Sequence, residues 1–83
     1  ETMIAYDLKS TSNVTIQLLN MNGQAIQTFS FGEQSTGSYE LYWDGRDKLG
    51  KNLASGVYVC RLSAIPNTGE SPFIANRKMT LIR

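Results

Sequence analysis

The fold class of this chain follows from the stretch Val14-Thr15-Ile16-Gln17-Leu18-Leu19-Asn20-Met21-Asn22-Gly23. Its apolar residues Val14, Ile16 and Leu18 recur at every second position, and this period of two is typical of a half-buried strand. Asn22 and Gly23 follow, and both tolerate the positive φ that a type I′ hairpin turn demands. The stretch therefore predicts a strand that turns back into an antiparallel neighbour.

The same alternation recurs on both sides of this stretch. The other predicted strands cover residues 4–8, 24–31, 39–43, 56–62 and 73–82. Within 24–31, Ile26 and Phe29 lie three positions apart, which indicates a bulge or a change of face. The strand that ends at Trp43 is expected at the centre of the core, and loop 44–55 is expected to join neighbouring strands.

The predicted elements indicate a single all-β domain over residues 1–83. No segment of ten or more residues has an apolar stripe with the 3.6-residue period of a helix, and 83 residues leave room for one core only. Six or seven short strands separated by turn residues are typical of a β-sandwich.

The composition argues against several classes of function. Eight Lys and Arg residues against seven Asp and Glu residues leave a formal charge of +1, so the basic face of a nucleic-acid binder is not expected. No apolar run approaches the roughly 20 residues of a membrane-spanning helix. The local excess of cations at Arg77, Lys78 and Arg83 is typical of a solvated edge.

The residue types also argue against catalysis and against cofactors. The chain has no histidine and a single cysteine, Cys60, so it predicts no disulfide, no zinc or iron–sulfur site and no nucleophile–histidine pair. Cys60 is expected to be a small buried apolar residue. Asp44, Asp47 and Glu40 do not reproduce the ligand ladder of a calcium loop. We therefore expect no enzyme activity, no cofactor and no metal.

Several motifs along the chain resemble the immunoglobulin-like family named for the flagellar hook-capping protein, which also forms the last domain of many secreted bacterial proteins. The most specific motifs are Trp43-Asp44-Gly45-Arg46-Asp47, Ala54-Ser55-Gly56-Val57-Tyr58 and Lys78-Met79-Thr80-Leu81-Ile82-Arg83. The resemblance extends over essentially the whole chain. It departs from the common pattern in lacking Asn-Pro-Phe-Asn-Pro before the first strand and in having a longer, Pro-rich connection from Ala64 to Phe73, which predicts an exposed loop.

The resemblance implies an immunoglobulin-like or fibronectin-III-like antiparallel β-sandwich of about seven strands. It also implies a C-terminal module of a larger exported protein, secreted or at the cell surface, that acts as a sorting signal for the type IX secretion system. The partners would be the secretion machinery or neighbouring domains. The candidate interaction residues lie in the last strand and are Arg77, Lys78, Met79, Leu81 and Arg83.

Most of the family signature is interpreted as structural. The signature residues are Trp43, Asp44, Gly45, Asp47, Gly50, Gly56 and Tyr58. The glycines can adopt backbone conformations closed to other residues, the aspartates can accept hydrogen bonds from loop amides, and the aromatic rings can fill the core.

Two other functions stay open at this stage. One is a structural spacer or assembly module, as in the flagellar hook cap. The other is an accessory carbohydrate-binding module with Tyr42 as the stacking ring, although Tyr42 is better interpreted as covering a sheet face or contacting a neighbouring domain. A partner that pairs with an edge strand is also consistent with a sandwich of this size.

Overall fold

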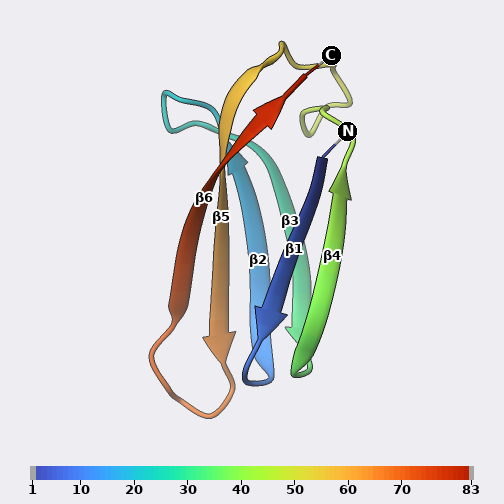
Figure 1. Cartoon of the computed structure of the whole chain (residues 1–83). Coiled ribbons are helices and arrows are strands. Elements are labelled where there is room, and N and C mark those ends of the chain that lie inside the picture. The colour runs from blue at the N-terminus through green and yellow to red at the C-terminus, as the bar shows by residue number, and fades with distance from the viewer. Residues whose placement is uncertain (1, 83) are drawn as a thin grey trace.

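The computed structural model describes residues 2–82, and all of their regular structure is β-strand (Figure 1). The strands are β1 (Thr2–Leu8), β2 (Ser12–Leu19), β3 (Ala25–Gln34), β4 (Gly37–Trp43), β5 (Gly56–Pro66) and β6 (Phe73–Leu81). No helix of the described chain is long and apolar enough to cross a membrane. The expected all-β class is confirmed, with six strands in place of about seven.

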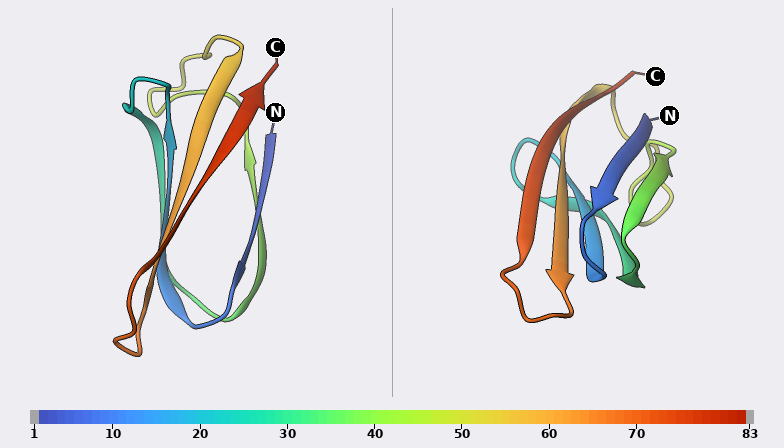
Figure 2. Two further views of the ribbon diagram at one scale, coloured as in Figure 1. Left: turned by 60° about the vertical axis from the view of Figure 1, so that its left-hand side comes forward. Right: turned by 60° about the horizontal axis from the view of Figure 1, so that its bottom comes forward.

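The strands form two sheets that face one another (Figures 1 and 2). One sheet pairs β1 with β4, and the other has the order β3-β2-β5-β6. Every pair is antiparallel. In this sandwich β2 and β5 lie at the centre of the large sheet, and β1 and β6 are unpaired on their outer sides.

The position of β4 differs from the expectation. β4 pairs with β1 alone, so it is not a central strand, and loop 44–55 crosses from the small sheet to β5 in the large sheet instead of joining neighbours. The alternation of Tyr39, Leu41 and Trp43 correctly showed which face of β4 is buried. Alternation carries no information about which strand lies alongside another. For this reason the predicted central position of this strand was wrong.

The hairpin between β2 and β3 is confirmed, but its turn type is not. Gly23 has a φ of 82°, whereas no described residue other than glycine has a positive φ, so Asn22 cannot occupy a type I′ turn. The Asn20 N–H donates to the Gln24 carbonyl at 3.0 Å, and the Gly23 N–H donates to the Asn20 carbonyl at 3.0 Å. This is a three-residue loop that ends in a left-handed glycine.

The irregularity expected in the third strand is a pair of bulges. The register runs from Leu18 opposite Gln27 to Leu19 opposite Ala25, which leaves Ile26 as an extra residue. A second shift, between Val14 and Thr15, leaves Phe31 without a partner. Because the first bulge changes the phase of the strand, Ile26 and Phe29 both pack against the core despite their spacing.

The core lies between the two sheets, and twelve buried residues of the described range 2–82 form it. They are Ile4, Leu8, Val14, Ile16, Leu18, Trp43, Tyr58, Cys60, Leu62, Ala64, Met79 and Leu81. Cys60 is free and buried, as its expected role as a small apolar residue requires.

Candidate interaction surface

The signature residues around Trp43 anchor both ends of loop 44–55. The Trp43 indole Nε1–H donates to the Arg46 carbonyl at 2.9 Å. The Tyr58 hydroxyl donates to the Ala54 carbonyl at 2.6 Å, four residues upstream of its own position. This second bond is the tyrosine corner of immunoglobulin-like sandwiches, which closes the connection between the two sheets.

The loop itself is held by carboxylate caps and by glycines. Asp47 Oδ1 accepts the backbone N–H groups of Leu49 and Lys51, both at 2.9 Å. Gly45 and Gly50 have φ values of 79° and 81°, in the left-handed region that favours glycine. Gly56 does not have a positive φ, so the expectation of a special backbone conformation is wrong for this glycine.

The acidic side chains of residues 2–82 do not gather into a metal site. No group of three or more Cys, Asp or Glu side chains in this part of the chain could hold a metal ion. Asp44 accepts the N–H of Arg46 at 3.1 Å, so it serves the same loop as Asp47. Both aspartates therefore have structural roles in loop 44–55.

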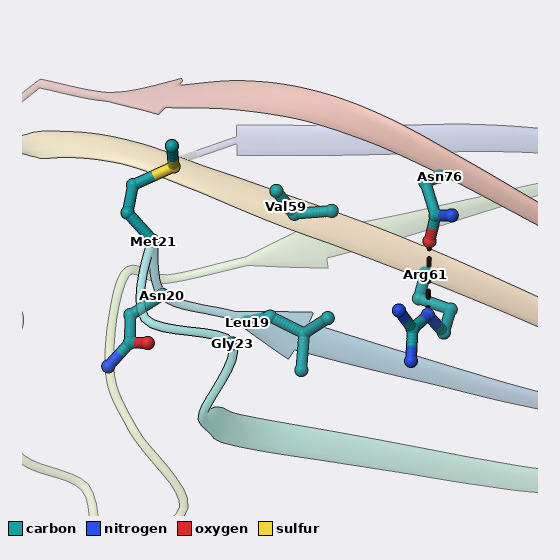
Figure 3. A pocket seen from close by; sticks show the side chains of 7 residues that line it. All are labelled: Leu19, Asn20, Met21, Gly23, Val59, Arg61 and Asn76. Atoms are coloured by element: carbon teal, nitrogen blue, oxygen red, sulfur yellow. Dashed lines mark hydrogen bonds between the residues drawn. The ribbon is translucent and has the colours of Figure 1, made fainter.

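The outer face of the large sheet carries a hollow of about 320 Å³ (Figure 3). We call this the outer-face hollow. Its lining residues are Leu19, Asn20, Met21, Gly23, Val59, Arg61 and Asn76. Figure 3 shows Leu19 and Val59 on neighbouring strands, Met21 to their left on the hairpin turn, and Arg61 joined to Asn76 of β6 by a hydrogen bond of 3.1 Å.

Leu19 is the unusual residue of this hollow. It is only 7% exposed, yet it is absent from the cluster between the sheets, because its neighbour Leu18 occupies the core side of β2. Met21 is 63% exposed at the rim. The sequence does contain a signal for this site: Leu19 is an apolar residue on the otherwise polar side of a strand, and Met21 follows it in the turn. The predictions from sequence did not include this site.

The electrostatics of the outer-face hollow are one-sided. Arg61 lies in its wall, and Lys78 lies directly opposite Val59 in the register of β5 and β6. Positions that share this face of β2, β5 and β6 carry no Asp or Glu, and the structure records no ion pair for either cation among residues 2–82. The surface is therefore an apolar depression with a cationic border.

The structure does not bring the candidate residues of the last strand to one surface. Met79 and Leu81 are 8% and 1% exposed and belong to the core. Arg77 and Lys78 are exposed but lie on opposite faces of β6, since they are paired with Cys60 and Val59 respectively. Arg83 lies outside the described residues. An interaction role for these side chains stays a prediction.

Tyr42 is exposed on the outer face of the small sheet. It is 62% exposed and lies opposite Met3 in the register of β1 and β4. The other residues that share this face within these two strands are not aromatic. A sugar platform built on Tyr42 would thus rest on one ring.

Comparison with known proteins assigns the family. A model of the FlgD Ig-like domain matches residues 2–68, which is most of the chain. The chain belongs to the FlgD Ig-like domain family. The matched part ends before β6, so the closing motif from Lys78 lies outside it. The family is structural and non-enzymatic.

The fold of the FlgD Ig-like domain also appears in a solved structure. The crystal structure of FlgD from P. aeruginosa matches with a TM-score of 0.76 and 22% sequence identity. The match covers 94% of this chain and 58% of the FlgD chain, so this chain spans little more than half of that protein. At this identity the likeness shows the immunoglobulin-like fold alone. No curated protein matches the sequence.

Proposed function

We propose that this FlgD-type domain is a non-catalytic assembly module that packs against a neighbouring domain or subunit through the outer-face hollow. The observation that carries the proposal is the position of Leu19, Val59 and Met21, which place apolar surface on the solvent side of the large sheet. Contiguous apolar surface with a polar rim is typical of protein–protein contacts. FlgD, the similar solved protein, is longer than this chain, and the resemblance to the flagellar hook-capping family supports an assembly role.

The neighbour has a definable chemistry. An apolar side chain would fill the hollow above Leu19 and Val59, and a carboxylate at its edge would pair with Arg61 or Lys78. Such pairs at the rim of an interface chiefly set the orientation and the association rate. The neighbour is therefore expected to present an apolar residue flanked by Asp or Glu.

The test is the size of the native assembly that contains this domain. Met21→Glu places a charge at the rim of the hollow, at a residue that is 63% exposed and so does not support the core. Ile65→Glu is the matched control. Ile65 is 53% exposed and lies on the same face of β5 as Val59, but it does not line the hollow. Light scattering on the protein purified from its host should show a smaller assembly for Met21→Glu only. Equal sizes for both variants would contradict the proposal.

The sorting role implied by the resemblance is a separate proposal and is supported by the sequence motif alone. Export and a location outside the cell belong with it. Its sharpest test uses Lys78→Glu, which reverses an exposed charge on the outer face of β6, away from the core. Retention of the parent protein inside the cell, with the assembly size unchanged, would favour sorting over assembly.

A further inference from the structure

The two sheets have one open side, between β1 and β6. Each of these strands is the outermost of its sheet. Figures 1 and 2 show that the start of β1 and the end of β6 lie near each other, and that the strands then diverge toward Leu8 and Phe73. This wedge is bounded by the unpaired edges of two sheets, whereas on the other side of the sandwich Ser35 and Thr36 connect β3 directly to β4.

Hollows follow one another along this wedge, and we call them together the β1–β6 groove. The first is about 40 Å³ in volume and lies among Ile4, Ala5, Cys60, Ala75 and Arg77. The second is about 300 Å³ and lies at the wide end, where its lining includes Leu8, Phe73 and the acidic residues Asp7 and Glu70. Phe73 is 56% exposed there, so apolar surface of the sandwich is left open along the groove.

Arg77 bridges the narrow part of the groove. Its Nη1 donates to the Ala5 carbonyl of β1 at 3.5 Å, which is at the long limit for a hydrogen bond and hence weak. The Ala5 carbonyl belongs to the free edge of β1, where a neighbouring strand would otherwise supply the donor. No carboxylate among residues 2–82 forms a recorded ion pair with the Arg77 guanidinium. Arg77 thus makes a weak bond at the position where the N–H of a strand paired with β1 would donate.

We infer that the β1–β6 groove accepts one extended segment of a neighbouring polypeptide, which adds to the free edge of β1 and carries a carboxylate that pairs with Arg77. An N–H of the incoming strand takes over the Ala5 carbonyl, and the released guanidinium binds the carboxylate, a stronger charge-assisted contact. Apolar side chains of the same segment cover Ala75 and Phe73. The added strand stabilises the β1–β4 sheet most, because a two-stranded sheet has only marginal stability and a third strand raises it.

A second copy of this chain is a poorer occupant. Pairing of β6 with β6 around a two-fold axis would bring Arg77 and Lys78 of one copy toward the same cations of the other, and charged edge residues of this kind oppose such pairing. Neither β1 nor β6 offers a carboxylate near the level of Arg77, since the acid of β1 is Asp7, whose Oδ1 already accepts the Ser38 hydroxyl at 2.6 Å. The narrow part of the groove, around Arg77, therefore fits a carboxylate carried by a different segment.

The inference goes beyond the proposed assembly role and does not use the outer-face hollow. The probe is the capped peptide Thr-Val-Thr-Val-Asp-Val-Thr-Val-Thr, and its control replaces Asp by Lys. Titration followed by NMR should show binding of the Asp peptide at least about tenfold tighter than the Lys peptide, and hydrogen exchange should slow at β1. Met21→Glu should leave this binding unchanged, so failure here and failure of the assembly proposal are distinguishable.

Variants locate the charge contact. Arg77→Gln should remove the preference for the Asp peptide, whereas Lys78→Gln, on the opposite face of the same strand, should retain it. Equal affinity for the two peptides, or slowed exchange at β3 instead of β1, would overturn the inference. So would a dimer of residues 1–83 that excludes the peptide, or a longer native polypeptide whose own chain already fills the groove.

Discussion

Trp43 of β4 and Tyr58 of β5 meet edge to face across the two sheets, with ring centroids 5.5 Å apart and an interplanar angle of 78°. Such aromatic pairs stabilise a fold by about 0.5–1.5 kcal/mol beyond their burial. The pair joins the strand that precedes loop 44–55 to the strand that follows it. Since β4 and β5 belong to different sheets, this contact and the two hydrogen bonds beside it hold the sandwich together at that corner.

Tyr58→Phe should destabilise the domain by about 1–2 kcal/mol, because it leaves the Ala54 carbonyl without its partner and keeps the ring. Chemical denaturation followed by the fluorescence of Trp43 measures the change. Tyr42→Phe is the control, since Tyr42 is 62% exposed and its hydroxyl has no recorded bond. Equal stability of the two variants would argue against the corner.

Gly50→Ala should cost about 1–2 kcal/mol, because an alanine at a φ of 81° enters the left-handed region. Gly56→Ala is a matched control. A Cβ at either glycine would meet no atom within 4 Å, so the two sites differ in backbone conformation and not in space. Thermal unfolding of both variants measures the difference. A loss at Gly56 as large as the loss at Gly50 would contradict the assignment.

Leu81→Ala should destabilise the domain by about 2–5 kcal/mol, the usual cost of emptying a buried leucine site. Lys78→Ala, an exposed position on the same strand, should change stability by no more than about 0.5 kcal/mol. Urea unfolding of the purified domain checks both values. Deleting residues 78–83 would therefore unfold the domain, and secretion assays need the point variants instead.

Stability should fall as the pH rises above about 9. Burial raises the pKa of the Cys60 thiol above its ordinary value of 9.0, and nearby Arg77 partly offsets this. The unfolded chain then releases the thiol proton at lower pH than the folded chain. The contribution of the protonated thiol to the free energy of unfolding is therefore complete below pH 9.0 and is lost above it. Burial likewise raises the pKa of Tyr6 above 10.0, which extends the loss at higher pH.

Denaturant unfolding from about pH 8 to about pH 11 tests this dependence. Cys60→Ala should flatten the fall near pH 9, and Tyr6→Phe should affect only its upper part. An unchanged slope in Cys60→Ala would show that the thiol does not contribute. The comparison uses slopes, because removing a buried sulfur also lowers stability at every pH.

Local spacing along the chain was enough to place the strands and, apart from the bulged strand β3 and Leu19, to show which side of each strand is buried. Val14, Ile16 and Leu18 alternate because successive side chains of a strand point to opposite sides, and that rule needs no tertiary information. The cap at Asp47 and the left-handed conformation of Gly50 also follow from residue type, since each acts within a few positions of its own loop.

Contacts between distant segments were decided by the tertiary structure. Three features depend on which strands and side chains lie next to one another: the partner of β4, the turn geometry at Asn22 and the burial of Leu19 on the outer face. The periodicity of the sequence does not specify these neighbours. The same holds for Arg77. Its sequence context indicates a solvated cation, but only the divergence of β1 and β6 places it across an open groove, within reach of the Ala5 carbonyl.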